Sequence, residues 1–186
     1  TPTGIGNSGS VFIYYKSGGP GAISSYTKTQ MQRGSTGAYS VSLPASITTA
    51  NGVSYWYEIS DGIETVTSPI TSPNFKPYSI LVEIPDGVVR NSPQPAGADQ
   101  NFYRLVSVPL VQTSGSVNFG EYSPEAWRLF RWQSGKYVEH NENGFETFAP
   151  GRGYWFITTK AASIQSGTGK SARTDKPFSI FLQPGW

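Results

Sequence analysis

Short runs in which large apolar side chains alternate with polar ones, each run ending at Gly, Pro, Asn or Ser, constrain this chain more than any other feature. In residues 53–60, for example, Val53 and Tyr55 fall on one side of an extended strand, and Ser54 and Glu58 fall on the other. This period of two, bounded by turn residues, is typical of half-buried β-strands. No segment shows a convincing amphipathic helical pattern, so the sequence predicts an all-β fold.

The aromatic content indicates how such strands build a core. Hydrophobic residues make up only 37% of the 186 residues, but 5 Trp, 11 Tyr and 10 Phe supply large rings, each of which buries much area. The chain is therefore long enough for two small cores. Prolines punctuate residues 68–100, and we interpret 86–100 as a linker. We expect two β-sandwich-like domains, at residues 1–85 and 101–186.

Turn signals divide the two predicted domains into strands. Asp61-Gly62 and Ser134-Gly135 have the composition of hairpin turns. In the first domain we expect strands at residues 11–16, 23–31, 38–43, 53–60, 63–67 and 78–84. In the second we expect them at 102–110, 127–133, 136–139, 144–148, 153–158 and 178–182.

Composition also excludes several classes of protein. The chain has no Cys, which rules out disulfides and thiolate metal sites. The net charge is +2 and the basic residues are not clustered, so we expect no nucleic-acid partner. No apolar run reaches the roughly 18–20 residues that span a bilayer, so we expect no membrane insertion. Low charge combined with abundant Ser, Thr, Asn and Gly favours a secreted or cell-surface, extracellular location.

The residues that could carry chemistry are few. The single His140 lies in a polar turn, and the Gly-x-Ser-x-Gly elbow of Ser–His hydrolases is missing. Gly-Lys-Ser at 169–171 lacks the earlier glycine of a phosphate-binding loop, because that position is Ile164. A glycosidase pair would have to come from five carboxylates, Glu121, Glu125, Glu139, Glu142 and Glu146, which are more typical of surface charges. We therefore predict no enzyme, no catalytic or metal-binding residue and no cofactor.

Exposed aromatic rings are the strongest hint of binding. Trp56, Trp132 and Tyr137 are candidates for stacking on sugar rings, as planar side chains do in carbohydrate-binding modules. The alternative is that these rings are packing residues. Trp127 and Trp155 are expected to fill the second core, because that half of the chain has few aliphatic residues.

The first half of the chain resembles the bacterial immunoglobulin/fibronectin-III-like modules of large secreted proteins. The resemblance covers about residues 10–67 and rests on Tyr14-Tyr15-Lys16, Leu43-Pro44 and the run 55–59 before Asp61-Gly62. The second half, from Tyr103 to Trp186, is similar to a β-rich module that follows such domains in surface proteins of Bacteroidota and related bacteria. These resemblances imply an immunoglobulin-like first domain and no catalytic residues.

Compared with the family pattern, the chain looks cut at both ends, so the first domain is expected to be incomplete. Strand edges at 11–16 and 178–182 would then be open to association. The residues expected at these edges are Val11, Ile13, Tyr15, Phe178, Ile180 and Leu182. The expected partners are other domains of the same larger protein, or neighbouring copies that add a strand.

These observations predict a non-catalytic structural or adhesion segment of a larger extracellular bacterial protein. One alternative is a carbohydrate-binding module with a surface glycan as its partner. Another is an ancillary part of a secreted hydrolase whose catalytic domain lies outside this chain.

Overall fold

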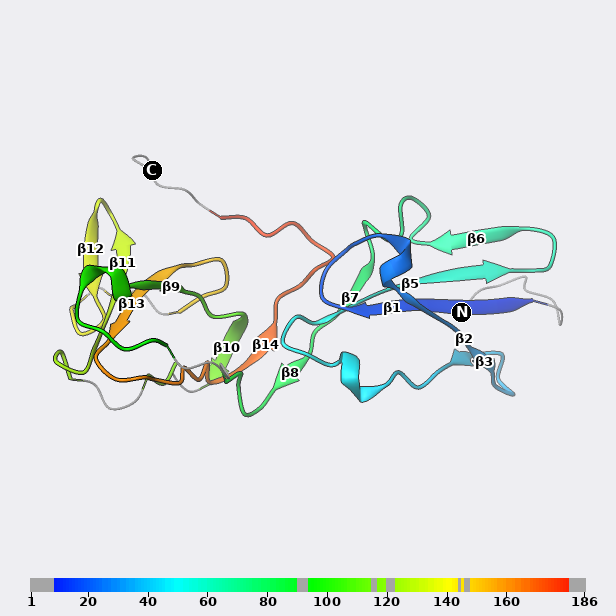
Figure 1. Ribbon diagram of the computed structural model, residues 1–186. Coiled ribbons are helices and arrows are strands. Elements are labelled where there is room, and N and C mark those ends of the chain that lie inside the picture. Colours follow the sequence, from blue (N-terminus) through cyan, green and yellow to red (C-terminus); the bar gives the residue numbers. More distant parts are fainter. Residues whose placement is uncertain are drawn as a thin grey trace. The chain divides into compact units, whose positions relative to one another are not determined.

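The computed structural model describes residues 9–89, 94–114, 117–119, 123–143, 145 and 148–180 (Figure 1). The strands pair in antiparallel sheets, and the helical residues described form short 3-10 turns at η1 (Ile23–Ser25), η2 (Ala45–Ile47) and η3 (Gln100–Phe102). The prediction of an all-β fold is thus confirmed. Contacts divide the chain into two compact units. Unit 1 comprises Thr1–Val82 and Arg173–Phe178, and unit 2 comprises Glu83–Ala172 and Ser179–Trp186.

The main sheet of unit 1 is built around two long strands, β1 (Ser10–Ser17) and β5 (Val53–Ser60), which pair along their whole length. The sheet has the order β2-β1-β5-β6, and β7 also pairs with β5 (Figure 1). A separate hairpin joins β3 to β4. The bounds of these strands are β2 Thr27–Gln30, β3 Gln32–Arg33, β4 Tyr39–Ser40, β6 Thr65–Ser68 and β7 Tyr78–Ile80.

The predicted open edge at residues 11–16 is wrong, because β1 lies between β2 and β5. Val11, Ile13 and Tyr15 are buried and belong to the core. Their alternation, taken alone, fits an edge strand and a central strand equally well. What makes β1 a central strand is that two later segments, β2 and β5, both pair with it.

Unit 2 contains two sheets whose strands come from distant parts of the sequence. One sheet has the order β12-β11-β13-β9 and the other has the order β10-β14-β8. The bounds are β8 Glu83–Ile84, β9 Arg104–Val106, β10 Leu110–Ser114, β11 Trp127–Gln133, β12 Lys136–Glu139, β13 Tyr154–Thr158 and β14 Thr168–Ser171. Two sheets per unit are consistent with β-sandwich-like packing.

Aromatic rings form much of the core of unit 2, as the composition predicted. Phe119 is at the centre, with its ring centroid 5.1 Å from that of Trp127 and 5.0 Å from that of Phe156. Tyr154 and Leu129 are fully buried beside them. On β11 the odd-numbered residues therefore point into the core, and on β13 the even-numbered residues do. The outward face of this sheet is formed by the even-numbered residues of β11 and the odd-numbered residues of β13.

The predicted linker at 86–100 differs from the structure, because its described residues are bonded within unit 2. The backbone N–H of Gln94 donates to the carbonyl of Ala162 at 2.8 Å, and that of Gly97 donates to Thr158 at 2.9 Å. Each proline lacks only its own backbone N–H group, so a residue between two prolines, such as Gln94, can still donate a backbone hydrogen bond.

The strand predicted at 178–182 is also wrong where it is described, because residues 178–180 form no strand. Phe178 and Ile180 are exposed, and Leu182 lies outside the described residues. An alternating run becomes a strand only where another strand offers it backbone partners. The described part of this run has none.

Candidate binding surface

Trp56 is one of the three predicted stacking residues, and the structure buries it in unit 1. Only 3% of its surface is exposed. The ring of Tyr14 on the neighbouring strand stacks on it at 3.7 Å between centroids, and Tyr26 meets it edge-on at 6.3 Å. Trp56 is therefore a packing residue and is not available to a ligand, so its prediction as a stacking residue is wrong.

The other two predicted residues face each other across the β11–β12 hairpin of unit 2. The turn places Ser134 and Gly135 at φ values of 52° and 81°, the backbone of a two-residue type I′ turn. This turn makes Trp132 and Tyr137 direct cross-strand partners. Their rings are 4.9 Å apart at 74°, so they form a corner and not one flat platform.

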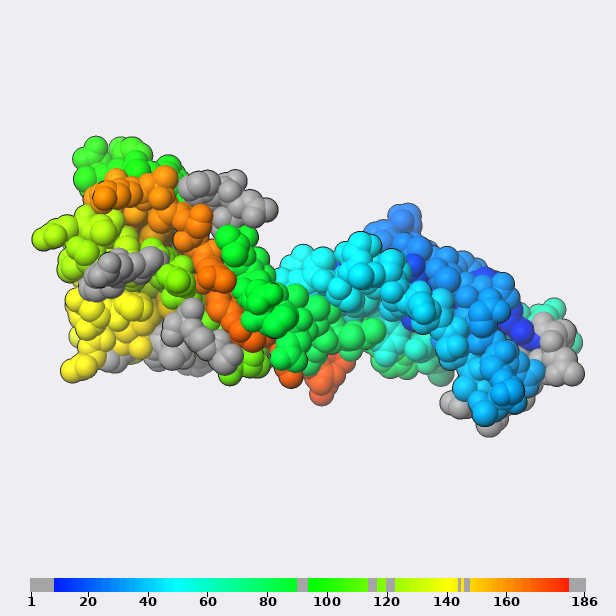
Figure 2. All heavy atoms as spheres, turned by 90° about the horizontal axis from the view of Figure 1, so that it is seen from below, coloured from blue at the N-terminus to red at the C-terminus, as the bar shows by residue number. Residues whose placement is uncertain are grey.

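The outward face of this sheet carries an aromatic groove, which we define by Gln100, Tyr103, Phe130, Tyr137 and Trp155. The groove is open and has a volume of about 410 Å³. Tyr137 is 56% exposed and Trp155 is 37% exposed. The ring of Tyr103 lies 6.1 Å from that of Phe130. In Figure 2 the β12 end of the hairpin, in yellow, lies at the surface of unit 2.

Strand pairing explains why these rings gather. Phe130 on β11 is the direct partner of Trp155 on β13, and Trp155 is in turn the partner of Leu105 on β9. Residues paired in this way point to the same face of a sheet. The sequence indicated alternation in residues 153–157, but Trp155 was expected in the core. In fact its neighbours Tyr154 and Phe156 occupy the interior.

An ion pair lies on the same outward face. Arg128 donates two hydrogen bonds to Glu139, from Nε to Oε1 at 2.8 Å and from Nη2 to Oε2 at 2.7 Å. The Arg128 guanidinium also lies 4.7 Å from the centre of the Phe130 ring. The hydrogen bonds from Arg128 hold the pKa of Glu139 below its ordinary value. Glu139 is thus an ionised partner of Arg128, which is unlike the protonated acid that a glycosidase requires.

Among the described residues, the other side chains considered for catalysis or metal binding do not come together in one site. His140 is half-buried, and its ring meets those of Trp127 and Phe145 edge-on at 5.5 and 5.4 Å. Glu121 and Glu146 lie outside the described residues. Within the described ranges, no three His, Cys, Asp or Glu side chains group as metal ligands do.

Sequence reasoning found Tyr137 but missed Tyr103, Phe130 and Trp155. Trp132 is half-buried beside the groove and supports Tyr137. The sequence does show the alternation of odd- and even-numbered positions within the runs 127–133 and 153–157, which separates the two faces of each strand. It becomes decisive only when one residue of each run is known to be buried.

The part of the chain that the structure describes contains no helix long and apolar enough to cross a membrane. Comparisons of the chain with protein-family models, curated proteins and solved structures find no match. The resemblance to immunoglobulin/fibronectin-III-like modules therefore stays a prediction.

Proposed function

We propose that this chain is a non-catalytic adhesion segment of a larger extracellular bacterial protein, and that it binds neutral glycan through the aromatic groove of unit 2. The observation that carries the proposal is the gathering of Tyr103, Phe130, Tyr137 and Trp155 on one outward sheet face. Rings of this size are normally buried in a core or at an interface. An open groove lined by four of them is suited to an apolar, ring-shaped surface.

Sugar rings match this groove chemically. One face of a pyranose presents C–H groups, which pack against the negative face of an aromatic ring. Its hydroxyls need polar partners at the edge, and the side chain of Gln100 lines the same groove. Arg128 and Glu139 neutralise each other on this face, which favours an uncharged ligand over an acidic one.

The binding test uses the full chain and soluble neutral oligosaccharides of β-linked glucose, N-acetylglucosamine, xylose and mannose. Trp155 and Trp132 make tryptophan fluorescence a direct reporter, and calorimetry supplies the affinity. Trp155→Ala and Tyr137→Ala are each expected to weaken binding roughly tenfold. A ring contact contributes up to about 1.5 kcal/mol, and about 1.4 kcal/mol corresponds to a factor of ten.

Tyr78→Ala is the matched control, because Tyr78 is a partly exposed aromatic residue of unit 1, 38% exposed, on β7. It is expected to leave binding unchanged. The proposal fails if none of the four sugars binds, or if Tyr78→Ala weakens binding as much as Trp155→Ala does.

A further inference from the structure

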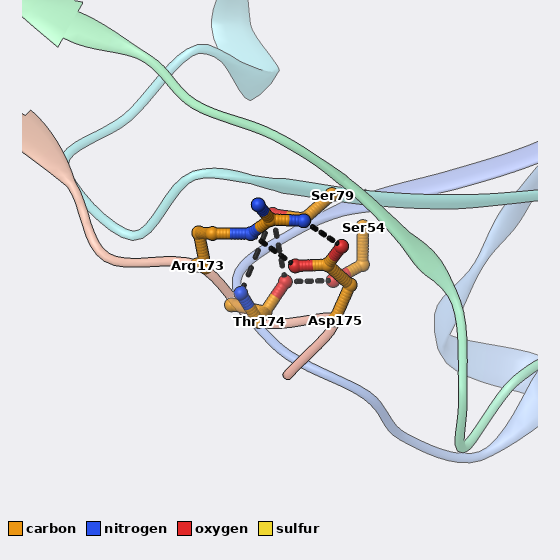
Figure 3. A network of polar contacts seen from close by, with 5 residues as sticks. All are labelled: Ser54, Ser79, Arg173, Thr174 and Asp175. Carbon is orange, nitrogen blue, oxygen red and sulfur yellow. Dashed lines mark hydrogen bonds and ion pairs between the residues drawn. The ribbon is translucent and has the colours of Figure 1, made fainter. Parts of the chain in front are cut away.

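Unit 1 contains a segment that follows unit 2 in the chain. We call Arg173–Phe178 the strap, because it belongs to unit 1 although residues 83–172 separate it from the rest of that unit. Figure 3 shows its point of attachment, where Thr174 sits between Ser54 of β5 and Ser79 of β7. Thr174 Oγ1 lies 3.0 Å from Ser54 Oγ and 3.2 Å from Ser79 Oγ.

The strap occupies a notch, which we define by Gly18, Gly19, Ser54 and Ser79. Ser54 is fully buried, and its hydroxyl donates to the carbonyl of Gly18 at 2.5 Å, which fixes the direction of its free lone pairs. The N–H of Thr174 donates to Ser79 Oγ at 3.3 Å. Gly19 lies against the Thr174 methyl group, which would be in ordinary contact, at 3.8 Å, with a Cβ built at residue 19.

The strap is itself shaped for this attachment. Arg173 and Asp175 form a bidentate ion pair across Thr174, and the chain bends at the threonine (Figure 3). The hydrogen bonds from Arg173 hold the pKa of Asp175 below its ordinary value. Thr174, the residue between these two charged side chains, is the one that bonds to Ser54 and Ser79.

The attachment depends on few contacts. Among the described residues, no backbone–backbone hydrogen bond joins the strap to the rest of unit 1. Lys176 and Pro177 are exposed, and Phe178 is 58% exposed. Because individual hydrogen bonds contribute modestly in water, the strap can leave the notch without unfolding the sheet.

The hinge of the strap is also short. Strand β14 ends at Ser171 and the strap begins at Arg173, so Ala172 alone lies between them. Short hinges favour exchange of an element between copies. The strap is thus a weakly held element behind a one-residue hinge.

We propose that two copies of this chain exchange their straps, with Thr174 of one copy seated against Ser54 and Ser79 of the other. The predicted assembly between neighbouring copies thus takes place at the notch of unit 1, and not at an open edge of β1. The proposal is independent of the glycan groove, which lies in unit 2.

The absence of cysteine from the 186 residues allows a direct test with the full chain. The single variants Ser79→Cys and Thr174→Cys are mixed, unfolded and refolded together over a range of concentrations, and then oxidised with copper phenanthroline. Exchange predicts a disulfide-linked heterodimer whose yield rises with concentration and exceeds several-fold that of Ser35→Cys mixed with Thr174→Cys. Ser35 is an exposed turn residue of unit 1 and serves as the matched control.

Two further samples keep the test decisive. The double variant Ser79→Cys/Thr174→Cys should form its disulfide within one chain at low concentration and between chains at high concentration. If Ser79→Cys impairs folding, Ser54→Cys with Thr174→Cys tests the same notch. Heterodimer yields equal to those of the Ser35 control, or a double variant that links only within one chain at every concentration, would overturn the proposal.

Discussion

The type I′ turn of the β11–β12 hairpin gives the sharpest test of how this backbone depends on its sequence. Gly135 has a φ of 81°, and a Cβ added there would meet no atom within 4 Å. A change to alanine is therefore opposed by backbone conformation alone, without any steric clash. We predict that Gly135→Ala destabilises unit 2, although no packing contact is lost.

The magnitude follows from two opposing effects. The left-handed conformation costs a residue with a Cβ roughly 1–2 kcal/mol. Replacing glycine also restricts the unfolded chain, which returns roughly 0.4–1 kcal/mol. The net destabilisation is therefore about 1 kcal/mol. With a urea dependence of roughly 1–3 kcal/mol per molar, the unfolding midpoint falls by roughly 0.3–1 M.

Ser134 supplies a variant of opposite sign at the adjacent position. It holds a φ of 52° as a non-glycine residue, and asparagine tolerates this region better than serine does. Ser134→Asn should raise the unfolding midpoint. Gly34→Ala is the control in unit 1, because Gly34 is not in the left-handed region and its added Cβ would be 3.5 Å from the nearest atom, the carbonyl oxygen of Ala38. It should be neutral or slightly stabilising.

The assay is urea unfolding followed by tryptophan fluorescence, together with hydrogen exchange read separately on peptides from 123–143 and from 27–40. The exchange data assign each change in stability to its own unit. The reasoning is refuted if Gly135→Ala proves as neutral as Gly34→Ala, or if Ser134→Asn lowers the midpoint.

Three further predictions concern buried and charged groups. Gln94 is 1% exposed and its amide atoms have no hydrogen-bond partner among the described residues. Gln94→Met should therefore keep the free energy of unfolding or raise it by up to about 3 kcal/mol, and a clear loss of stability in urea unfolding would contradict this. Leu129→Ala should cost about 2.7–5 kcal/mol in urea unfolding because Leu129 is fully buried, whereas Leu105→Ala, at a residue that is 64% exposed, should cost less than about 0.5 kcal/mol; similar costs would refute the assigned core. Lys28 and Arg128 hold the pKa values of Glu58 and Glu139 below the ordinary 4.5, so their stabilisation is complete above pH 4.5 and is lost as the pH falls through the folded-state pKa values. Unfolding free energies measured from pH 6 to pH 3 should therefore fall less steeply in the double variant Glu58→Gln/Glu139→Gln. The difference should be at most about 1 kcal/mol per pair, because both ion pairs are partly exposed. An unchanged slope would exclude these two ion pairs as the cause of the loss of stability in acid.

Local signals in the sequence were sufficient for the long strands and for two hairpin turns, but they missed β14 and placed a strand at 178–182, whose described residues form none. The hairpin at Ser134-Gly135 was predicted correctly because only a few residue types suit its backbone. The hairpin after Asp61 was also predicted, although its loop extends to Glu64. Asp61 Oδ1 accepts hydrogen bonds from the N–H groups of Ile63 and Glu64, which closes a longer turn.

Trp56 and Trp155 show the limit of these local signals. Trp56 was expected to be exposed and is buried, whereas Trp155 was expected in a core and is partly exposed. Alternation separates a strand into two faces, but it does not say which face the rest of the chain covers. That choice depends on contacts between distant residues, such as the stacking of Tyr14 on Trp56. The groove could not be predicted for the same reason.

The position of the strap late in the chain has a consequence for biosynthesis. A ribosome completes residues 9–82 and then residues 83–172 of unit 2 before Thr174 is synthesised, so the Ser54–Ser79 notch stays empty throughout that interval. Nascent chains on one messenger are close neighbours during this time. The order of translation therefore gives a newly made copy an opportunity to receive the strap of another copy before its own has been synthesised.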